Sequence, residues 1–229
     1  MRDWSDAVAD LVDAWRDRSP ARLLATMLFV AAPCPAYAHP HVFIDVMMQV
    51  EIDAAGAVSG LRYDWAFDDF YSAFMTQGLE RANGTPTPAA LAALAETFLE
   101  KLDDADYFTI ATAEDHQLQT SGAQNVNMRL EAGRLRLTFA LPLRSLKSPP
   151  RKISIKIFDP EYLVALDLKD DVGLVNAPAH CRLSVARPAA LSASDSAKLD
   201  DSKRTQKLEP DFGRKRANTI FIDCADAKD

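Results

Sequence analysis

The chain has 229 residues, of which 48% are hydrophobic and 26% are charged. These are ordinary values for a globular protein, and they exclude an intrinsically disordered chain. The formal net charge of −7 disfavours nucleic acids and anionic membrane surfaces as partners.

The N-terminal part has the pattern of an export signal. The apolar run of residues 23–32 has the length of a signal-peptide core rather than of a membrane span, and Ala36-Tyr37-Ala38 fits a signal-peptidase site. The segment before this run, in which arginines and aspartates mix, is an unusual N-terminal extension of such a signal. We therefore expect a signal peptide of residues 1–38 and a single exported domain of residues 39–229 in the periplasm.

Cleavage after Ala38 makes His39 the first residue, with His41 two positions later. The free amino group and the ring of His39 can then chelate a divalent transition metal together with the ring of His41. Pro40 has no backbone N–H, so the copper or nickel site that uses a deprotonated amide at the second position cannot form. The alternative is a frayed and solvated N-terminus without a metal.

Residues 42–52 alternate between apolar and mostly polar side chains, which predicts a long strand with one buried face. Asp45 lies on the same face as His41, but about 13 Å further along such a strand. It therefore cannot share a metal with His41 while the strand is continuous. After a turn at residues 54–56, residues 61–67 predict a second strand, antiparallel to the first.

Two helices are predicted after the second strand. Asp68 is the expected N-cap of the first, and Asn83-Gly84 its expected C-terminal stop. Thr87 followed by Pro88 begins the second helix. The stripe of this helix that we assign to the hydrophobic core consists of Leu91, Leu94, Phe98, Leu99 and Leu102.

The rest of the chain predicts short strands, with a hairpin turn at residues 131–134 and a turn at Asp159-Pro160. Residues 188–218 are crowded with charges and predict a solvated helix or loop, before apolar sequence returns at residues 219–222. The fold class that we predict is α+β, a mostly antiparallel, β-sandwich-like domain with a two-helix insertion after the second strand.

Cys181 and Cys224 are the two cysteines that follow the expected cleavage site. Because an exported chain matures in an oxidising compartment, we expect a disulfide between them. The alternative is that His180 and Cys181 together bind a metal, which leaves Cys224 as a free thiol.

Several of these features resemble those of an exported proteobacterial family, catalogued as domain of unknown function family 1007 (DUF1007). The resemblance covers essentially the whole mature chain. It is carried by HPHVFID at residues 39–45, WAFDDFYS at 65–72, FDPEY at 158–162 and the late pair of cysteines. The turn motif of the family usually has tyrosines where this chain has Phe158 and Leu163.

Members of this family are labelled as periplasmic components of ABC-type transport systems and are associated with NicO-type nickel and cobalt permeases and with zinc-responsive operons. The resemblance implies that the chain binds zinc, nickel, cobalt or copper, in metal homeostasis or as an accessory to an inner-membrane metal permease. It implies His39 and His41 as leading ligands. Asp159, in the matching turn, is implied as a further ligand or as a partner that orients one.

The sequence carries no enzyme motif: neither Gly-x-Ser-x-Gly nor His-Glu-x-x-His occurs. We therefore do not expect an enzyme. The strand-rich pattern also departs from the parallel-sheet, two-lobed architecture of common solute-binding proteins. The alternative to a metal-binding protein is a structural or interaction β-domain in the periplasm that has no metal affinity.

Overall fold

The alternating residues 42–52 form strand β1 (Val42–Ile52), as the sequence predicts. The computed structural model describes residues 42–114, 116–144, 150–197, 199 and 212–224, all within one unit of residues 37–229. In β1 the side chains from Ile44 to Ile52 at even positions are buried, whereas Phe43 and Gln49 are exposed. The period of two therefore separates a dry face from a solvated face.

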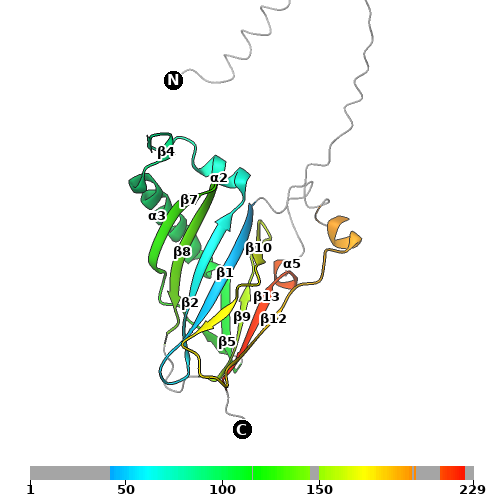
Figure 1. Cartoon of the computed structure of the whole chain (residues 1–229). Coiled ribbons are helices and arrows are strands. Elements are labelled where there is room, and N and C mark those ends of the chain that lie inside the picture. The colour runs from blue at the N-terminus through cyan, green and yellow to red at the C-terminus, as the bar shows by residue number, and fades with distance from the viewer. Residues whose placement is uncertain (1–41, 115, 145–149, 198, 200–211, 225–229) are drawn as a thin grey trace, which may run out of the picture. The chain divides into compact units, whose positions relative to one another are not determined.

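Within the described residues, β1 is part of a six-stranded sheet, called here the larger sheet, with the order β10-β1-β2-β8-β7 and with β11 also paired to β1 (Figure 1). The pairs β1–β2, β2–β8 and β7–β8 are antiparallel, and β10 and β11 run parallel to β1. Its other strands are β2 (Val58–Phe67), β7 (Gln124–Glu131), β8 (Arg134–Pro142), β10 (Val164–Leu168) and β11 (Gly173–Val175).

A second, smaller sheet has five strands in the described residues, in the order β12-β13-β9-β5-β6, and all of its pairs are antiparallel. Its strands are β5 (Thr109–Ala113), β6 (His116–Leu118), β9 (Lys152–Ile157), β12 (Arg182–Ala186) and β13 (Asn218–Asp223).

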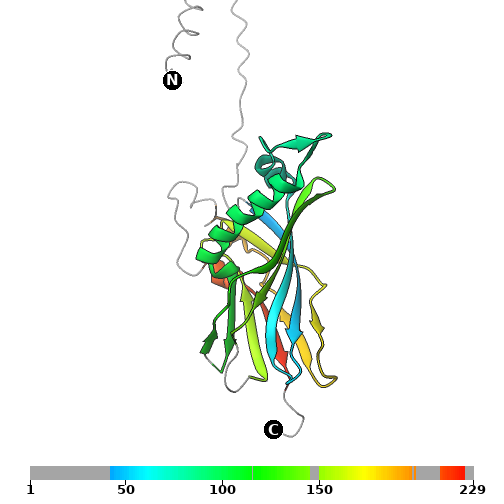
Figure 2. The ribbon, with the colours of Figure 1, turned by 90° about the vertical axis from the view of Figure 1, so that its left-hand side faces the viewer.

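Two helices follow β2 in the chain, α2 (Asp69–Met75) and α3 (Pro88–Asp104). The predicted caps are confirmed: the side chain of Asp68 accepts the N–H of Tyr71, and that of Thr87 accepts the N–H of Ala90. Figure 2 shows α3 lying along the larger sheet, where it contacts β7. The described residues also contain three short helical elements, which are η1 (Asp106–Phe108), a turn of helix at residues 193–197 and α5 (Phe212–Lys215).

The predicted end of the first helix at Asn83-Gly84 is wrong. Helix α2 ends at Met75, and a small hairpin follows, formed by β3 (Arg81–Ala82) and β4 (Thr85–Pro86). Asn83 and Gly84 are its two turn residues and have φ values of 52° and 81°. Asn-Gly favours this positive-φ pair in two-residue hairpin turns, so the dipeptide closes a hairpin here and does not cap a helix.

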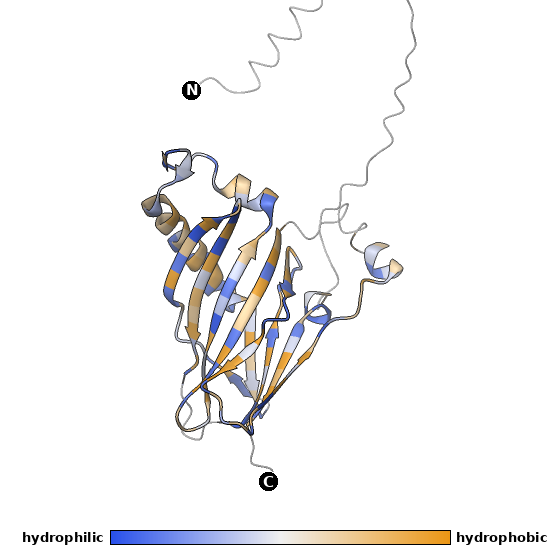
Figure 3. Ribbon diagram, in the orientation of Figure 1, coloured by the Kyte–Doolittle hydropathy of each residue, from blue (hydrophilic) through white to orange (hydrophobic). Residues whose placement is uncertain are grey.

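Nearly all the buried apolar side chains of both sheets and of α3 belong to one hydrophobic cluster. Figure 3 shows the alternation of apolar and polar residues along the strands that produces it. Trp65 is fully buried near the middle of this cluster, with its ring 5.1 Å from that of Phe139 and 5.8 Å from that of Tyr63. The domain is therefore mostly β with mainly antiparallel sheets, as predicted.

No helix among the described residues is long and apolar enough to cross a membrane. The expected cleavage site after Ala38, together with His39 and His41, lies outside the described residues. The same holds for part of the predicted charged segment, residues 198 and 200–211.

Candidate functional site

Three of the sequence motifs, those at residues 39–45, 65–72 and 158–162, come together where β1 begins. The N–H of Val42 donates to the carbonyl of Leu163 at 3.3 Å, next to the Phe158–Tyr162 turn. On the other side, the N–H of Asp68 donates to the carbonyl of Phe43 at 2.9 Å. The start of β1 is thus held between β10 and the segment that opens α2, and the described part of the chain begins directly after His41.

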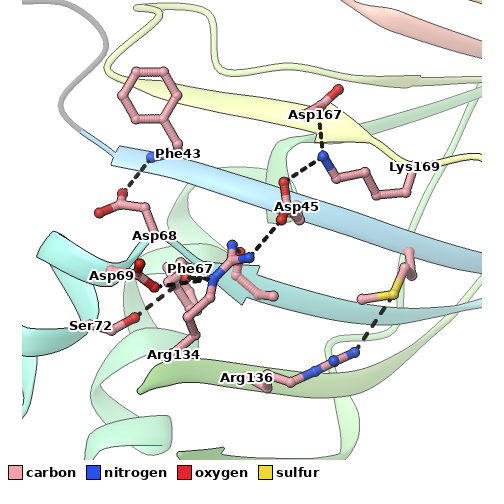
Figure 4. Close-up of polar contacts among 12 residues, drawn as sticks. Phe43, Asp45, Phe67, Asp68, Asp69, Ser72, Arg134, Arg136, Asp167 and Lys169 are labelled. Atoms are coloured by element: carbon pink, nitrogen blue, oxygen red, sulfur yellow. Dashed lines mark hydrogen bonds and ion pairs between the residues drawn. The ribbon is translucent and has the colours of Figure 1, made fainter. Parts of the chain in front are cut away.

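Asp68 holds the start of the strand and the start of the helix with one carboxylate. Its Oδ2 accepts the N–H of Phe43 at 2.9 Å, and its Oδ1 accepts the N–H of Tyr71 at 2.8 Å (Figure 4 shows the bond to Phe43). An N-cap carboxylate normally satisfies free N–H groups of its own helix. Here the second oxygen extends that role to β1, so α2 and β1 are fixed relative to each other.

Asp159, an implied metal ligand, is 6% exposed and lies in the turn before β10. Its Oδ1 accepts the N–H of Glu161 at 2.9 Å, and its Oδ2 accepts the N–H groups of Leu163 and Val164, both at 2.8 Å. The carboxylate therefore holds the turn that positions the Leu163 carbonyl against Val42. A direct bond from Asp159 to a metal stays a prediction.

Asp45 is the centre of an ion-pair network on the solvated face of β1, shown in Figure 4. Its carboxylate lies 2.8 Å from Nη1 of Arg134 and 2.7 Å from Nζ of Lys169. Arg134 also donates to the carbonyls of Phe67 and Ala66, at 2.6 and 2.8 Å. The network therefore connects β8, the end of β2, β1 and the residue after β10, across the end of the sheet at which the motifs meet.

These contacts change the titration of Asp45. Partial burial acts to raise the pKa of this carboxyl, but the hydrogen bonds from Lys169 and Arg134 and their positive charges together outweigh burial and hold the pKa below its usual value. In turn, hydrogen bonds to Asp167 and Asp45 raise the pKa of Lys169. Asp45 is therefore ionised, and in the folded protein its carboxylate is already paired with Arg134 and Lys169.

Replacing Asp45 with Asn is expected to destabilise the protein by about 1 kcal/mol near neutral pH and by less in acid. Because its folded-state pKa lies below the unfolded value of about 3.9, the ionised carboxylate stabilises the fold above that value. This contribution is lost as the pH falls through the folded-state pKa. Urea denaturation of both proteins at about pH 7 and about pH 3 measures the difference.

The matched control for this measurement is Asp104→Asn, at the exposed end of α3, where the described chain shows no cation against the carboxylate. It should change stability little at either pH. An Asp45→Asn effect that is equally large in acid and at neutral pH would contradict the ion-pair account.

Three phenylalanines at this end of the domain are exposed. Phe43 is 54% exposed, and Phe70 and Phe74 on α2 are 80% and 59% exposed. Phe70 and Phe74 are four positions apart, so they lie on one side of the helix. Single exposed apolar residues are common, but three large rings on the two segments that Asp68 connects make this end of the domain a candidate contact surface.

The described residues do not form a metal site by themselves. Among them, no group of three His, Cys, Asp or Glu side chains is close enough to hold a metal ion. Asp69 and Glu161, which flank the start of β1 on its two sides, are exposed carboxylates. Such oxygen ligands fit a borderline divalent metal only in combination with nitrogen ligands, which the sequence supplies at His39 and His41.

Cys181 and Cys224 form a disulfide bond, which confirms the predicted pairing. Along β13, Asn218 pairs with Ile157 and Asp223 pairs with Lys152. The disulfide therefore lies at the opposite end of β13 from the Phe158–Tyr162 turn. Nε2 of His180 lies 3.1 Å from the carbonyl of Cys224. The alternative in which Cys181 is a thiolate ligand does not apply to the oxidised protein.

Sequence reasoning does not single out Arg134 and Lys169. The pattern predicts Arg134 only as a hairpin residue, and its partner Asp45 is 89 positions away. The one sequence feature that points to this network is the alternation of β1, which places Asp45 on a solvated face. Finding its partners requires the order of strands in the sheet, which local patterns do not contain.

A comparison with protein-family models matches residues 24–224 to the family described as Protein of unknown function (DUF1007). A search among curated proteins finds no match. The matched region contains the motif at the start of β1, the segment that opens α2, the turn before β10 and both disulfide cysteines. The chain belongs to the DUF1007 family.

Proposed function

We propose that the chain is a periplasmic transition-metal-binding protein that acts in metal homeostasis or as an accessory to an inner-membrane metal permease, and that it is not an enzyme. The observation that carries the proposal is the fixed start of β1. Val42 and Phe43 are held by the Leu163 carbonyl and by Asp68, directly after His41 in the sequence. A histidine that precedes a fixed strand loses less conformational freedom on binding a metal than one in a free tail.

The proposed ligands are the free amine and ring of His39 and the ring of His41, with zinc, nickel, cobalt or copper as the metal. The exposed carboxylates of Asp69 and Glu161 are candidates to complete the coordination. Asp159 supports the site indirectly, because its carboxylate holds the turn beside Val42. Export to the periplasm is supported by the signal pattern of residues 1–38 and by a disulfide, which persists in oxidising compartments.

The proposal also includes the finer architecture. We take the two sheets as a β-sandwich into which α2 and α3 are inserted after β2. On this view the rigid sheets carry the start of β1, the inserted segment supplies Asp69 beside it, and the turn before β10 supplies Glu161.

A second candidate function is an interaction domain without metal affinity. The observation in its favour is the exposure of Phe43, Phe70 and Phe74 around the start of β1. The two functions differ in the expected role of the histidines, since a protein–protein contact through aromatic rings does not require imidazole ligands.

The mature protein that begins at His39 is expected to bind divalent transition metals in calorimetric titration, and cupric copper most tightly, because nitrogen sites follow the Irving–Williams order. His39→Ala and His41→Ala should each weaken binding at least about tenfold. Affinity should fall as the pH drops through about 6.5, where free imidazole is protonated. His116→Ala is the matched control, because the side chain of His116 is exposed on strand β6 and its loss should not affect binding.

A variant with one additional residue before His39 tests whether the N-terminal amine is a metal ligand. It keeps both imidazoles but moves the amino group away from the His39 ring. If it binds as tightly as the authentic N-terminus, the amine is not a ligand. If neither protein binds any of the four metals, the interaction-domain function replaces the metal-binding one.

A further inference from the structure

A cavity of about 260 Å³ lies between the Phe158–Tyr162 turn, β10 and the segment that contains α5. In Figure 1, α5 lies near β10 and the start of β13. Two of the lining residues, Asp167 and Arg187, are exposed, so solvent reaches the cavity. Pockets for drug-sized ligands start at about 300 Å³, so this cavity suits a smaller molecule.

Arg216 lines this cavity, and one of its N–H donors has no partner. One Nη of its guanidinium donates to the carbonyl of Ala189, but its Nε is buried and has no hydrogen-bond partner. In the part of the chain that the structure describes, no ion pair joins a carboxylate to Arg216. Buried N–H groups are almost always paired, so an acceptor is missing beside this guanidinium.

The other charged residues around the cavity have partners within the fold. Both oxygens of Asp159 accept backbone N–H groups, and Asp167 is 2.5 Å from Nζ of Lys169. Arg187 donates to the carbonyl of Leu168 and lies 2.6 Å from Asp170. Among the described residues that line the cavity, the charge without a counter-charge is therefore that of Arg216. A guanidinium presents its N–H groups in a planar fork that fits the adjacent oxygens of a carboxylate or a phosphate.

We propose that this cavity binds a small oxyanion, a carboxylate or an inorganic phosphate-like ion, and that the guanidinium of Arg216, whose Nε has no partner in the fold, donates to its oxygens. The buried amide of Asn218 forms part of the wall and is fixed by its bond to the Leu166 carbonyl at 2.9 Å. The described lining of the cavity includes Asp159 but neither Asp69 nor Glu161, and the carboxylate oxygens of Asp159 accept backbone N–H groups, so the site can exist whether or not the protein binds a metal.

The test is thermal unfolding of the mature protein in acetate, in phosphate and in chloride at the same ionic strength. At about ten times the Kd, a bound anion should raise the Tm by about 4 °C above the value in chloride. A rise in acetate alone identifies a carboxylate ligand, and a rise in phosphate alone identifies a phosphate-like one. If neither anion raises the Tm, the cavity holds only water and the proposal is wrong.

Variants of Arg216 show whether an increase in Tm comes from an anion bound in this cavity. Arg216→Gln, measured against its own Tm in chloride, should lose the rise, and Arg216→Lys, which keeps the charge but not the planar fork, should lose most of it. Arg182→Gln, on the exposed face of β12, is the matched control and should keep the full rise. A rise that persists in Arg216→Gln would place the anion elsewhere on the protein. Titration calorimetry at a temperature where each variant is folded gives the same comparison without unfolding.

Discussion

Reduction of the Cys181–Cys224 disulfide is expected to lower the free energy of unfolding by about 4 kcal/mol. The two cysteines are 43 positions apart, so the bond removes the entropy of closing a long loop from the unfolded chain. Within that loop lie β12 and β13, and Cys224 is 3% exposed at the end of β13. Urea denaturation of the mature protein with and without reductant measures the loss directly.

The control for the reductant is the double variant Cys181→Ala/Cys224→Ala. It should be less stable than the oxidised wild type by a similar amount, and added reductant should not change it further. A loss below about 1 kcal/mol on reduction would mean that the unfolded chain is already compact across this loop, and that the disulfide does not stabilise the smaller sheet as argued.

Replacing Gly213 with Ala is expected to destabilise the protein by about 3 kcal/mol, because α5 lies directly against the Asp159 turn. A Cβ on Gly213 would be 1.8 Å from the carbonyl oxygen of Asp159 and 2.8 Å from that of Pro160. Both atoms belong to the backbone, so they cannot move aside as a flexible side chain does. Relief requires α5 to move away from the turn, which breaks the contact between the rings of Tyr162 and Phe212, now 5.2 Å apart.

The matched control is Gly173→Ala in β11, where no atom lies within 4 Å of the added Cβ. It should change the free energy of unfolding by no more than about 0.5 kcal/mol. Hydrogen exchange adds a local readout: the N–H groups of Leu163 and Val164, bonded to Asp159, should lose protection in Gly213→Ala but not in Gly173→Ala. Equal stability of the two variants would show that α5 does not need this close contact.

Much of the fold follows from local patterns in the sequence. The alternation in β1 and β2 predicts both strands and their buried faces, and the capping residues Asp68 and Thr87 predict where two helices begin. Asn83-Gly84 shows the limit of such reasoning, because the same dipeptide suits a helix end and a hairpin turn. The parallel pairing of β10 and β11 with β1 joins segments far apart in the chain, and no local pattern specifies it.

The candidate site was predictable only in part. The motifs identify the start of β1, the Asp68 segment and the Asp159 turn as separate features, and the structure brings the three together. Asp159 illustrates why a residue type alone does not decide a role: a carboxylate is a metal ligand in one setting, and here its oxygens accept three backbone N–H groups. Arg134 and Lys169 join the site through strand order, which requires the tertiary structure.

The most direct test of the metal-binding function is the metal content of the protein purified from the periplasm with its authentic N-terminus. We predict that mass spectrometry shows His39 as the first residue, and that elemental analysis shows a stoichiometric amount of one divalent transition metal. The double variant His39→Ala/His41→Ala, purified in the same way, should be folded and free of that metal. A wild-type protein that begins at His39 and contains no more metal than the double variant would contradict the proposed function.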